Sequence, residues 1–234
     1  MGILTGIDGC KNGWICISKD MDTAKIYSEV FPNAKSLLKQ LSGSVILAVD
    51  IPIGLSEDER RLCDIQAKKL LGSRHTTVFF APIRPAVKAS NHKEANDIQR
   101  KICQHGLSIQ AFSICYKIRE FDEILSRQPR LQQRIKEVHP EVCFWAWNGN
   151  RNISYSKKTT EGAILRHNLI ADHFGIEAVK DIRSKYSCKT VADDDIHDAF
   201  ASLWTAERIL RDEASRIPDT PRRDEKGLYM EIWY

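Results

Sequence analysis

Two aspartates stand at the ends of segments that have the composition of β-strands. Asp8 closes the apolar stretch 3–8, and Asp50 follows the continuous apolar run 45–49, just before Pro52. Carboxylates at the carboxyl ends of strands lie where α/β sheets usually place their sites. A single such aspartate more often only opens a turn. Two at matching strand ends favour a functional role.

A third acidic group lies in the run Asp-Asp-Asp-Ile-His-Asp at residues 193–198. The apolar residues in and after this run recur at helical spacing, which predicts a helix over about 194–211. Asp195 and Asp198 are three residues apart and therefore share one side of that helix. The alternative is an acidic first turn that caps the helix and complements its dipole. Capping explains the first acidic residues of the run better than it explains Asp198.

Carboxylates from three such segments would carry a specific kind of chemistry if the fold brought them together. Held close, they repel one another unless a cation lies between them. Hard oxygen ligands suit Mg²⁺ or Mn²⁺, which keep bound waters and accept phosphate oxygens. Two such ions can activate water and stabilise the leaving oxygen of a phosphodiester. The sequence therefore predicts a two-metal site whose metal ligands and catalytic residues are Asp8, Asp50, Asp195 and Asp198.

A further candidate row lies in residues 137–145, which we expect to form a strand. On a strand Glu137, His139 and Glu141 would point to the same face. Such a row could bind metal or supply a general base with its orienting partner, so His139 and Glu141 are candidate catalytic residues. It could equally be the solvated face of an edge strand, because Pro140 disfavours a central position.

Four basic side chains are candidates for binding a phosphate-containing substrate. Arg74 and Arg84 flank a proline-rich extended segment, and each could bind a phosphate through two hydrogen bonds. Lys157 and Lys158 precede a predicted helix and could contact backbone phosphates. The alternative for each is an ordinary solvated surface residue.

The elements that must position these residues alternate between strand and helix. An Asn-Gly-containing turn after Asp8 predicts a hairpin of two strands. Further strands are predicted at 25–31, 45–51 and 137–145, with an apolar tail at 228–234; helices are predicted at about 33–41, 57–71, 93–103, 108–127, 159–174 and 194–211. This order describes a mixed sheet with helices on its faces.

Composition excludes several protein classes. With 42% hydrophobic and 28% charged residues the chain has the make-up of a soluble globular protein rather than a disordered one. The net charge of +4 permits contact with a polyanion without requiring it. Seven cysteines without a Cys-x-x-Cys pair argue against a disulfide framework and a zinc knuckle. No targeting segment or long apolar run is present, so we expect a cytoplasmic protein without membrane contact.

Several short motifs, in one order along the chain, resemble an uncharacterised bacterial and archaeal family described as predicted nucleases of the RNase H fold. They are Gly6-Ile7-Asp8-Gly9-Cys10-Lys11-Asn12-Gly13-Trp14, Val49-Asp50-Ile51-Pro52-Ile53-Gly54-Leu55, Leu71-Gly72-Ser73-Arg74, Val78-Phe79, Pro82-Ile83-Arg84, Glu137-Val138-His139-Pro140-Glu141, Lys157-Lys158-Thr159 and Asp194-Asp195-Ile196-His197-Asp198-Ala199. The resemblance covers about residues 5–233. It implies a single RNase H-like α/β domain over 1–234: a mixed five-stranded sheet, helices on both faces, and a mainly helical insertion after the fourth strand, at about 56–135. It also implies a nuclease that acts on DNA or RNA with Mg²⁺ or Mn²⁺.

The sequence is more distantly similar to the Holliday-junction resolvases of the same superfamily. In those enzymes acidic residues come from the first strand, the fourth strand and the final helix, the places occupied here by Asp8, Asp50 and the Asp195/Asp198 pair. Their fourth-strand residue is usually Glu, so Asp50 is shorter by one methylene. The segment 137–141 has no clear equivalent in them. Both departures leave the substrate and the mechanism open.

Two other functions stay open at this point. The first is a phosphotransferase or nucleotide hydrolase, since actin-like ATPases and sugar kinases share this core and their phosphate-binding hairpin resembles Asp8-Gly9. Those proteins normally duplicate the domain, for which 234 residues is short. The second is a non-catalytic nucleic-acid-binding adaptor. The apolar C-terminal tail could in addition pair between chains and form a homodimer.

Overall fold

The computed structural model describes residues 2–234 and divides the chain into two compact units. The first unit contains the chain up to Asp50, residues Arg134–Ser215 and the final Trp233–Tyr234; the second contains Ile51–Gln133 and Arg216–Ile232. The segment 56–135, predicted as an insertion, falls in the second unit except for its last two residues. That unit also takes in residues near the C-terminus that the sequence analysis did not assign to it.

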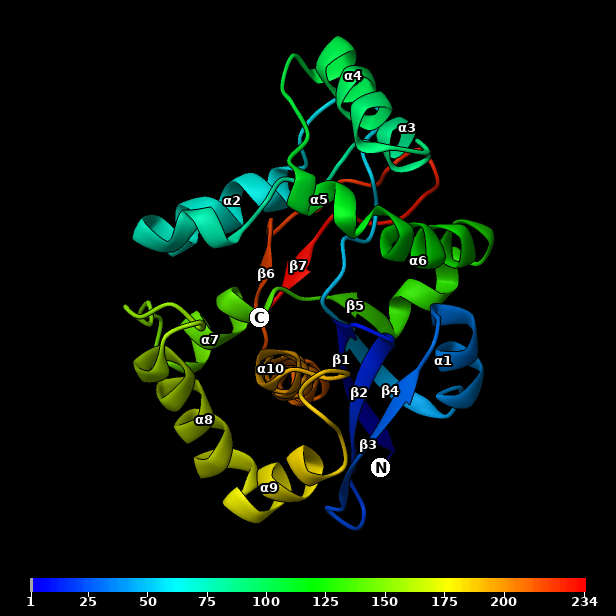
Figure 1. Ribbon diagram of the computed structural model, residues 1–234. Coiled ribbons are helices and arrows are strands. Elements are labelled where there is room, and N and C mark those ends of the chain that lie inside the picture. Colours follow the sequence, from blue (N-terminus) through cyan, green and yellow to red (C-terminus); the bar gives the residue numbers. More distant parts are fainter. Residues whose placement is uncertain (1) are drawn as a thin grey trace. The chain divides into compact units, whose positions relative to one another are not determined.

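The first unit is built on a five-stranded mixed sheet (Figure 1). The strands lie in the order β3-β2-β1-β4-β5, with bounds β1 Ile3–Cys10, β2 Gly13–Asp20, β3 Ile26–Phe31, β4 Ser44–Val49 and β5 Ile135–Glu137. The pairs β1–β2 and β2–β3 are antiparallel, whereas β1–β4 and β4–β5 are parallel. The predicted hairpin and the mixed five-stranded sheet are therefore confirmed.

Five helices belong to the same unit: α1 Ala34–Gln40, α7 Pro140–Trp147, α8 Thr160–Phe174, α9 Ile176–Ser184 and α10 Asp193–Leu210. Helix α10 packs across β1, β2 and β4, while α1 contacts β3. In Figure 1 these two helices lie on opposite sides of the sheet. The prediction of helices on its faces is confirmed, and α9 is a helix that the sequence analysis did not identify.

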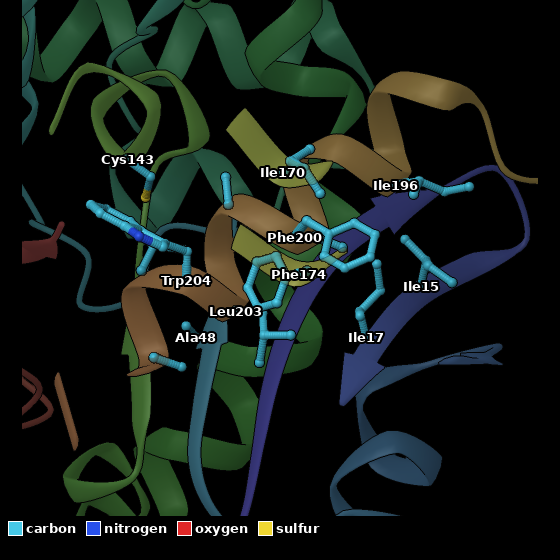
Figure 2. Close-up of a cluster of buried hydrophobic side chains, with 14 of the residues drawn as sticks. Ile15, Ile17, Ala48, Cys143, Ile170, Phe174, Ile196, Phe200, Leu203 and Trp204 are labelled. Carbon is cyan, nitrogen blue, oxygen red and sulfur yellow. The ribbon is translucent and has the colours of Figure 1, made fainter. Parts of the chain in front are cut away.

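The core of this unit lies between α10 and the sheet (Figure 2). Ile15, Ile17 and Ala48 from the strands meet Phe200 and Leu203 from the helix, all of them fully buried. Full burial of a side chain the size of Leu or Phe contributes about 1.5–3 kcal/mol. The apolar stripe of α10 is therefore what holds this helix, and the acidic residues it carries, against the strands.

Gly6 lets α10 approach the sheet closely. A Cβ at this position would lie 2.1 Å from the carbonyl oxygen of Ala199 and 2.2 Å from the backbone nitrogen of Leu203. No side chain fits at such distances, so β1 and α10 touch backbone to backbone. This contact fixes the height of α10 above the strand that carries Asp8.

The second unit is mainly helical. Its helices are α2 Leu62–Leu71, α3 Arg84–Val87, α4 His92–Cys103, α5 Ile109–Ser113 and α6 Cys115–Arg127, with 3₁₀ turns η1 Gly72–Thr77 and η2 Pro129–Gln133. The single helix predicted over 108–127 is interrupted at Ile114, and the first helix begins at Leu62 rather than near 57.

The prediction of a strand over 137–145 is wrong. Strand β5 ends at Glu137, and α7 begins at Pro140 with His139 as its N-cap in an extended conformation. Proline is well suited to the first turn of a helix, because the N–H that it lacks has no helical partner there. Glu137, His139 and Glu141 therefore do not form a row on one face of a strand.

The apolar C-terminal tail is used within the chain. Only β7, Ile232–Trp233, is a strand, and it pairs with β6, Arg216–Ile217. Leu228 and Ile232 are buried, so part of the apolar tail that suggested pairing between chains is covered in this fold. Between residues 2 and 234 no helix combines the length and the apolar character that crossing a bilayer requires, and no two cysteines of this part form a disulfide.

A carboxylate cluster as candidate active site

The register of β1 and β4 places Asp8 and Asp50 side by side. In this parallel pair Gly6 lies opposite Ala48 and Ile7 opposite Val49. The Asp50 N–H donates to the Ile7 carbonyl at 3.0 Å and so extends the pairing by one residue. Side chains alternate along a strand. Asp8 therefore shares the α10 face with Gly6, and Asp50 shares it with Ala48.

Asp198, in the second turn of α10, faces the same place. Its side chain is only 6% exposed, and its charge acts on both strand aspartates. Three carboxylates from β1, from the end of β4 and from α10 are thus gathered at one edge of the sheet. We call Asp8, Asp50 and Asp198 the carboxylate cluster.

The cluster is electrostatically unfavourable when all three groups are ionised. Burial, followed by the charges of Asp50 and Asp198, raises the pKa of Asp8 well above its ordinary value. Burial and then the charge of Asp198 raise the pKa of Asp50 to about 8, although a hydrogen bond with Asp8 opposes this. Burial raises the pKa of Asp198 to about 6. Without a further cation the cluster therefore holds protons more tightly than isolated aspartates do.

Lys157 supplies a positive charge to this cluster. Its Nζ donates to Asp198 Oδ2 at 2.5 Å and lies 3.6 Å from Asp194 Oδ2. Burial by itself would lower the pKa of this ammonium, but the charges of Asp198, Asp8 and Asp194 raise it. The sequence analysis assigned Lys157 to substrate phosphates and Asp194 to helix capping. The structure places both beside Asp198.

Asp195 makes the contact that the capping alternative predicts. Its Oδ2 accepts a hydrogen bond from the Ala192 N–H at 2.8 Å, at the third residue of α10. A carboxylate here satisfies one of the unpaired N–H groups of the helix start and complements the dipole. For Asp195 the capping alternative describes the structure, and its charge acts on Asp8 more weakly than those of Asp50 and Asp198 do.

Glu141 and Glu137 lie around the cluster. Both oxygens of Glu141 accept from Arg166 Nη2, at 2.7 and 2.9 Å, and the charge of Glu141 adds to the raised pKa of Asp198. Glu137 is buried at the end of β5, and its charge raises the pKa of Asp50. Sequence reasoning did not select Glu137 as a site residue. The signal that it missed was an acid at the end of a third parallel strand.

The remaining basic candidates have different surroundings. Arg84 is buried in the second unit and donates to Asp122, Glu57 and Asp224 through all three of its nitrogens. The charge of this buried guanidinium is met by three carboxylates, so its contacts do not support the predicted role of Arg84 in substrate binding. Arg74 lies in η1 of the same unit and is partly buried. Lys158 belongs to the first unit and is exposed.

The donor set suits a hard divalent cation. Three carboxylates against one ammonium leave an excess of negative charge when all are ionised, and oxygen donors are those that Mg²⁺ and Mn²⁺ prefer. Within residues 2–234 no group of three or more His, Cys, Asp or Glu side chains is arranged so that it could hold a metal ion. Mg²⁺ is usually held by only one or two carboxylates, together with waters and substrate phosphates.

Comparison with known proteins identifies a family. No curated protein and no solved structure matches the chain significantly. Residues 6–223, which include the whole carboxylate cluster and Lys157, match the model of a family described as protein of unknown function (DUF429). The chain therefore belongs to the DUF429 family.

Proposed function

We propose that the protein is a metal-dependent nuclease, which hydrolyses phosphodiesters of DNA or RNA with Mg²⁺ or Mn²⁺, and that its first unit is an RNase H-like domain. The observation that carries this proposal is the convergence of Asp8, Asp50 and Asp198 at one partly buried edge of the sheet. Burying mutually repelling carboxylates is costly unless a cation or a proton is bound. Such a cost is typical of functional sites.

The positions of the three aspartates support the RNase H-like assignment. They come from the first strand, the end of the fourth strand and the final long helix. These are the places that the resemblance to the resolvases implies. The mixed five-stranded sheet with a long helix across it is compatible with the same superfamily.

Each residue then has a defined task. A bound divalent ion would acidify water and neutralise charge on the phosphate, and Asp8, Asp50 and Asp198 would hold it. Arg166 fixes the Glu141 carboxylate near Asp198. The exposed Lys158, next to Lys157, is available to a neighbouring backbone phosphate.

Cleavage assays with a variant pair test the proposal. Labelled single-stranded, duplex, RNA–DNA hybrid and branched substrates are incubated with the protein and Mn²⁺ or Mg²⁺. We expect metal-dependent cleavage that Asp8→Asn reduces by more than the roughly 10–100-fold which loss of a group supporting a metal ligand usually costs. Asp172→Asn, at an exposed position of α8, is the matched control and should cleave like the wild type.

Two results would count against the proposal. If the wild type leaves all four kinds of substrate intact with either ion, or if Asp8→Asn cleaves as well as the wild type, the nuclease assignment is wrong. A nucleotide-dependent rise in thermal stability together with phosphate release from nucleotides would point instead to a nucleotide hydrolase.

A further inference from the structure

The segment that joins α7 to α8 in the first unit, residues 148–159, carries positive charge and contains no acidic residue (Figure 1). We call it the α7–α8 loop. Its composition is three asparagines, two serines, two residues that are apolar or glycine-like in size, one threonine, one tyrosine and three cations, Arg151, Lys157 and Lys158. Arg151 and Lys158 are exposed, and Lys157 contacts Asp198 of the carboxylate cluster. The phosphates of a strand that reaches the cluster would therefore meet cations on this loop.

A cavity of about 330 Å³ lies between the α7–α8 loop and α8. Its volume falls in the range of about 300–1,000 Å³ that is usual for small-ligand sites. Apolar and amide side chains share its walls: Ile153, Leu165 and Leu169, and Asn148, Asn152 and Asn168. Neither lysine nor arginine lines it in the described part of the chain. The cavity therefore suits an uncharged molecule that has apolar faces and polar edges.

Tyr155 stands at this cavity on a fixed backbone. The tyrosine lines the cavity and is 50% exposed. Its carbonyl accepts from Nη1 of Arg166, a residue that is 1% exposed, at 3.4 Å. The next carbonyl, that of Ser156, accepts from the N–H and the hydroxyl of Thr159, both at 3.0 Å. An aromatic ring on such a support can stack on a flat ligand with little ordering of the chain.

The amide side chains supply the polar edges of the cavity. Asn148 Nδ2 donates to the Arg151 carbonyl at 3.1 Å, which fixes the orientation of that amide. The side chain of Asn168 makes no hydrogen bond within residues 2–234 and is exposed. Each amide offers both a donor and an acceptor, the combination that reads the edge of a nucleobase. In a duplex this edge is hidden by pairing, whereas an unpaired base can present it.

The acidic residues around the cavity do not oppose such a ligand. Asp172 lines the cavity and is exposed, and Glu161 is exposed in the first turn of α8. Solvated charges of this kind contribute little. The Glu141 carboxylate is held by Arg166 at 2.7 Å. A base is uncharged, and the charged phosphates beside it would lie along the cations of the loop.

We propose that this cavity binds an unpaired nucleobase and that the substrate of the carboxylate cluster is therefore single-stranded DNA or RNA. The inference rests on the proposed nuclease function and specifies its substrate. Tyr155 stacks on the base, the amides hydrogen-bond its edge, and Arg151 and Lys158 contact the neighbouring phosphates. Tyr155 precedes Lys157 by two residues, which span at most about 7 Å of extended chain. The bound base thus belongs to a nucleotide close to the phosphate at the cluster.

Binding to labelled oligonucleotides tests this without cleavage. Single-stranded DNA, single-stranded RNA and the duplex of the same sequence are compared by fluorescence anisotropy in EDTA. We expect single strands to bind at least about 5-fold more tightly than the duplex, the contribution of one stacked base. Tyr155→Ala should weaken single-strand binding by about 5–150-fold and leave duplex binding unchanged.

Two variants control for the loss of a tyrosine. Tyr155→Phe retains the ring and should bind single strands like the wild type. Tyr116→Ala removes a tyrosine of the second unit that is 48% exposed, nearly as much as Tyr155, and should also bind like the wild type. In the cleavage assay Tyr155→Ala should raise KM for single strands with little change in kcat, because stacking binds substrate and transition state alike.

The outcomes separate this inference from the proposed function. If the wild type binds the duplex as tightly as single strands, or if folded Tyr155→Ala binds single strands like the wild type, the inference is wrong. Metal-dependent cleavage of duplexes would then leave the nuclease in place. Failure to bind or cleave any of these nucleic acids would overturn both. The strand preference of the wild type is decisive even if Tyr155→Ala does not fold.

Discussion

Replacing Asp50 by asparagine should stabilise the metal-free protein at alkaline pH. Asparagine has nearly the shape of aspartate but cannot ionise. Burial, and after it the charge of Asp198, raises the pKa of the Asp50 carboxyl to about 8. In the unfolded chain this repulsion is absent. Above about pH 4 the ionisation of Asp50 therefore lowers the free energy of unfolding of the wild type, whereas the variant has no such loss.

The size of the effect follows from the shift. A pKa that moves from 3.8 to about 8 corresponds at pH 8 to a ceiling of about 5 kcal/mol, since one unit is worth 1.36 kcal/mol. Asp50 is partly exposed, and Lys157 lowers its pKa. Solvent screening reduces the ceiling, and we expect a gain of about 1–3 kcal/mol. For a chain of this size that raises the thermal midpoint by about 2 °C or more.

The pH dependence gives the prediction its sign. A carboxyl whose pKa is raised in the folded state contributes stability that is complete below the unfolded pKa and is lost as the pH rises through the folded pKa. The wild type should therefore lose stability between about pH 4 and pH 8 relative to Asp50→Asn, and the two should be nearly equal near pH 4.

Thermal and urea unfolding of metal-free protein at pH 4.5 and pH 8 measure this difference. Asp172→Asn, on the exposed side of α8, controls for the loss of one negative charge and should follow the wild type at both pH values. If Asp50→Asn gains nothing over the wild type between pH 4.5 and pH 8, the repulsion inferred from the structure does not exist.

Three further predictions concern the ion, the second unit and the packing of α10. Mn²⁺ should raise the thermal midpoint of the wild type more at pH 8 than at pH 5.5, because protons compete with the ion for carboxylates; an equal rise at both pH values would contradict the assignment of the ligands. Arg84→Met should cost about 3–5 kcal/mol in urea unfolding, because it leaves the buried Asp224 without its cation, while the number of bound Mn²⁺ ions stays the same. Gly6→Ala should lower the free energy of unfolding by at least about 1–3 kcal/mol, because its Cβ would meet the backbone of α10; Gly43→Ala, where no atom lies within 4 Å of the added Cβ, is the matched control and should be close to neutral.

Local patterns in the sequence were sufficient for the strands that carry Asp8 and Asp50. An apolar run followed by an acid predicts the strand and places the acid near its carboxyl end. Alternation along a strand then decides which side chains share a face. The apolar stripe of α10 was equally predictable, because helical spacing is a property of residues close together in the sequence. These elements depend on interactions over a few positions, and the sequence contains all of that information.

The errors arose where two local readings were equally good. Pro140 is compatible with an edge strand and with the first turn of a helix, and only the surrounding fold selects the helix. Spacing along α10 allows either Asp194 or Asp195 to accompany Asp198. The rotation of the helix about its axis, set by its backbone contact at Gly6, and the position of Lys157 decide for Asp194.

Contacts between distant segments lay outside the reach of the sequence. Arg84 is neutralised by carboxylates that come from three separate segments of the chain. A pattern of neighbouring residues cannot predict such partners. Lys157 likewise becomes part of the cluster only because the turn before α8 is anchored against that helix. Local patterns are enough to predict which strands and helices carry acidic residues and on which face those residues lie. Which cation contacts them depends on how elements far apart in the chain pack together, and that packing is visible only in the folded structure.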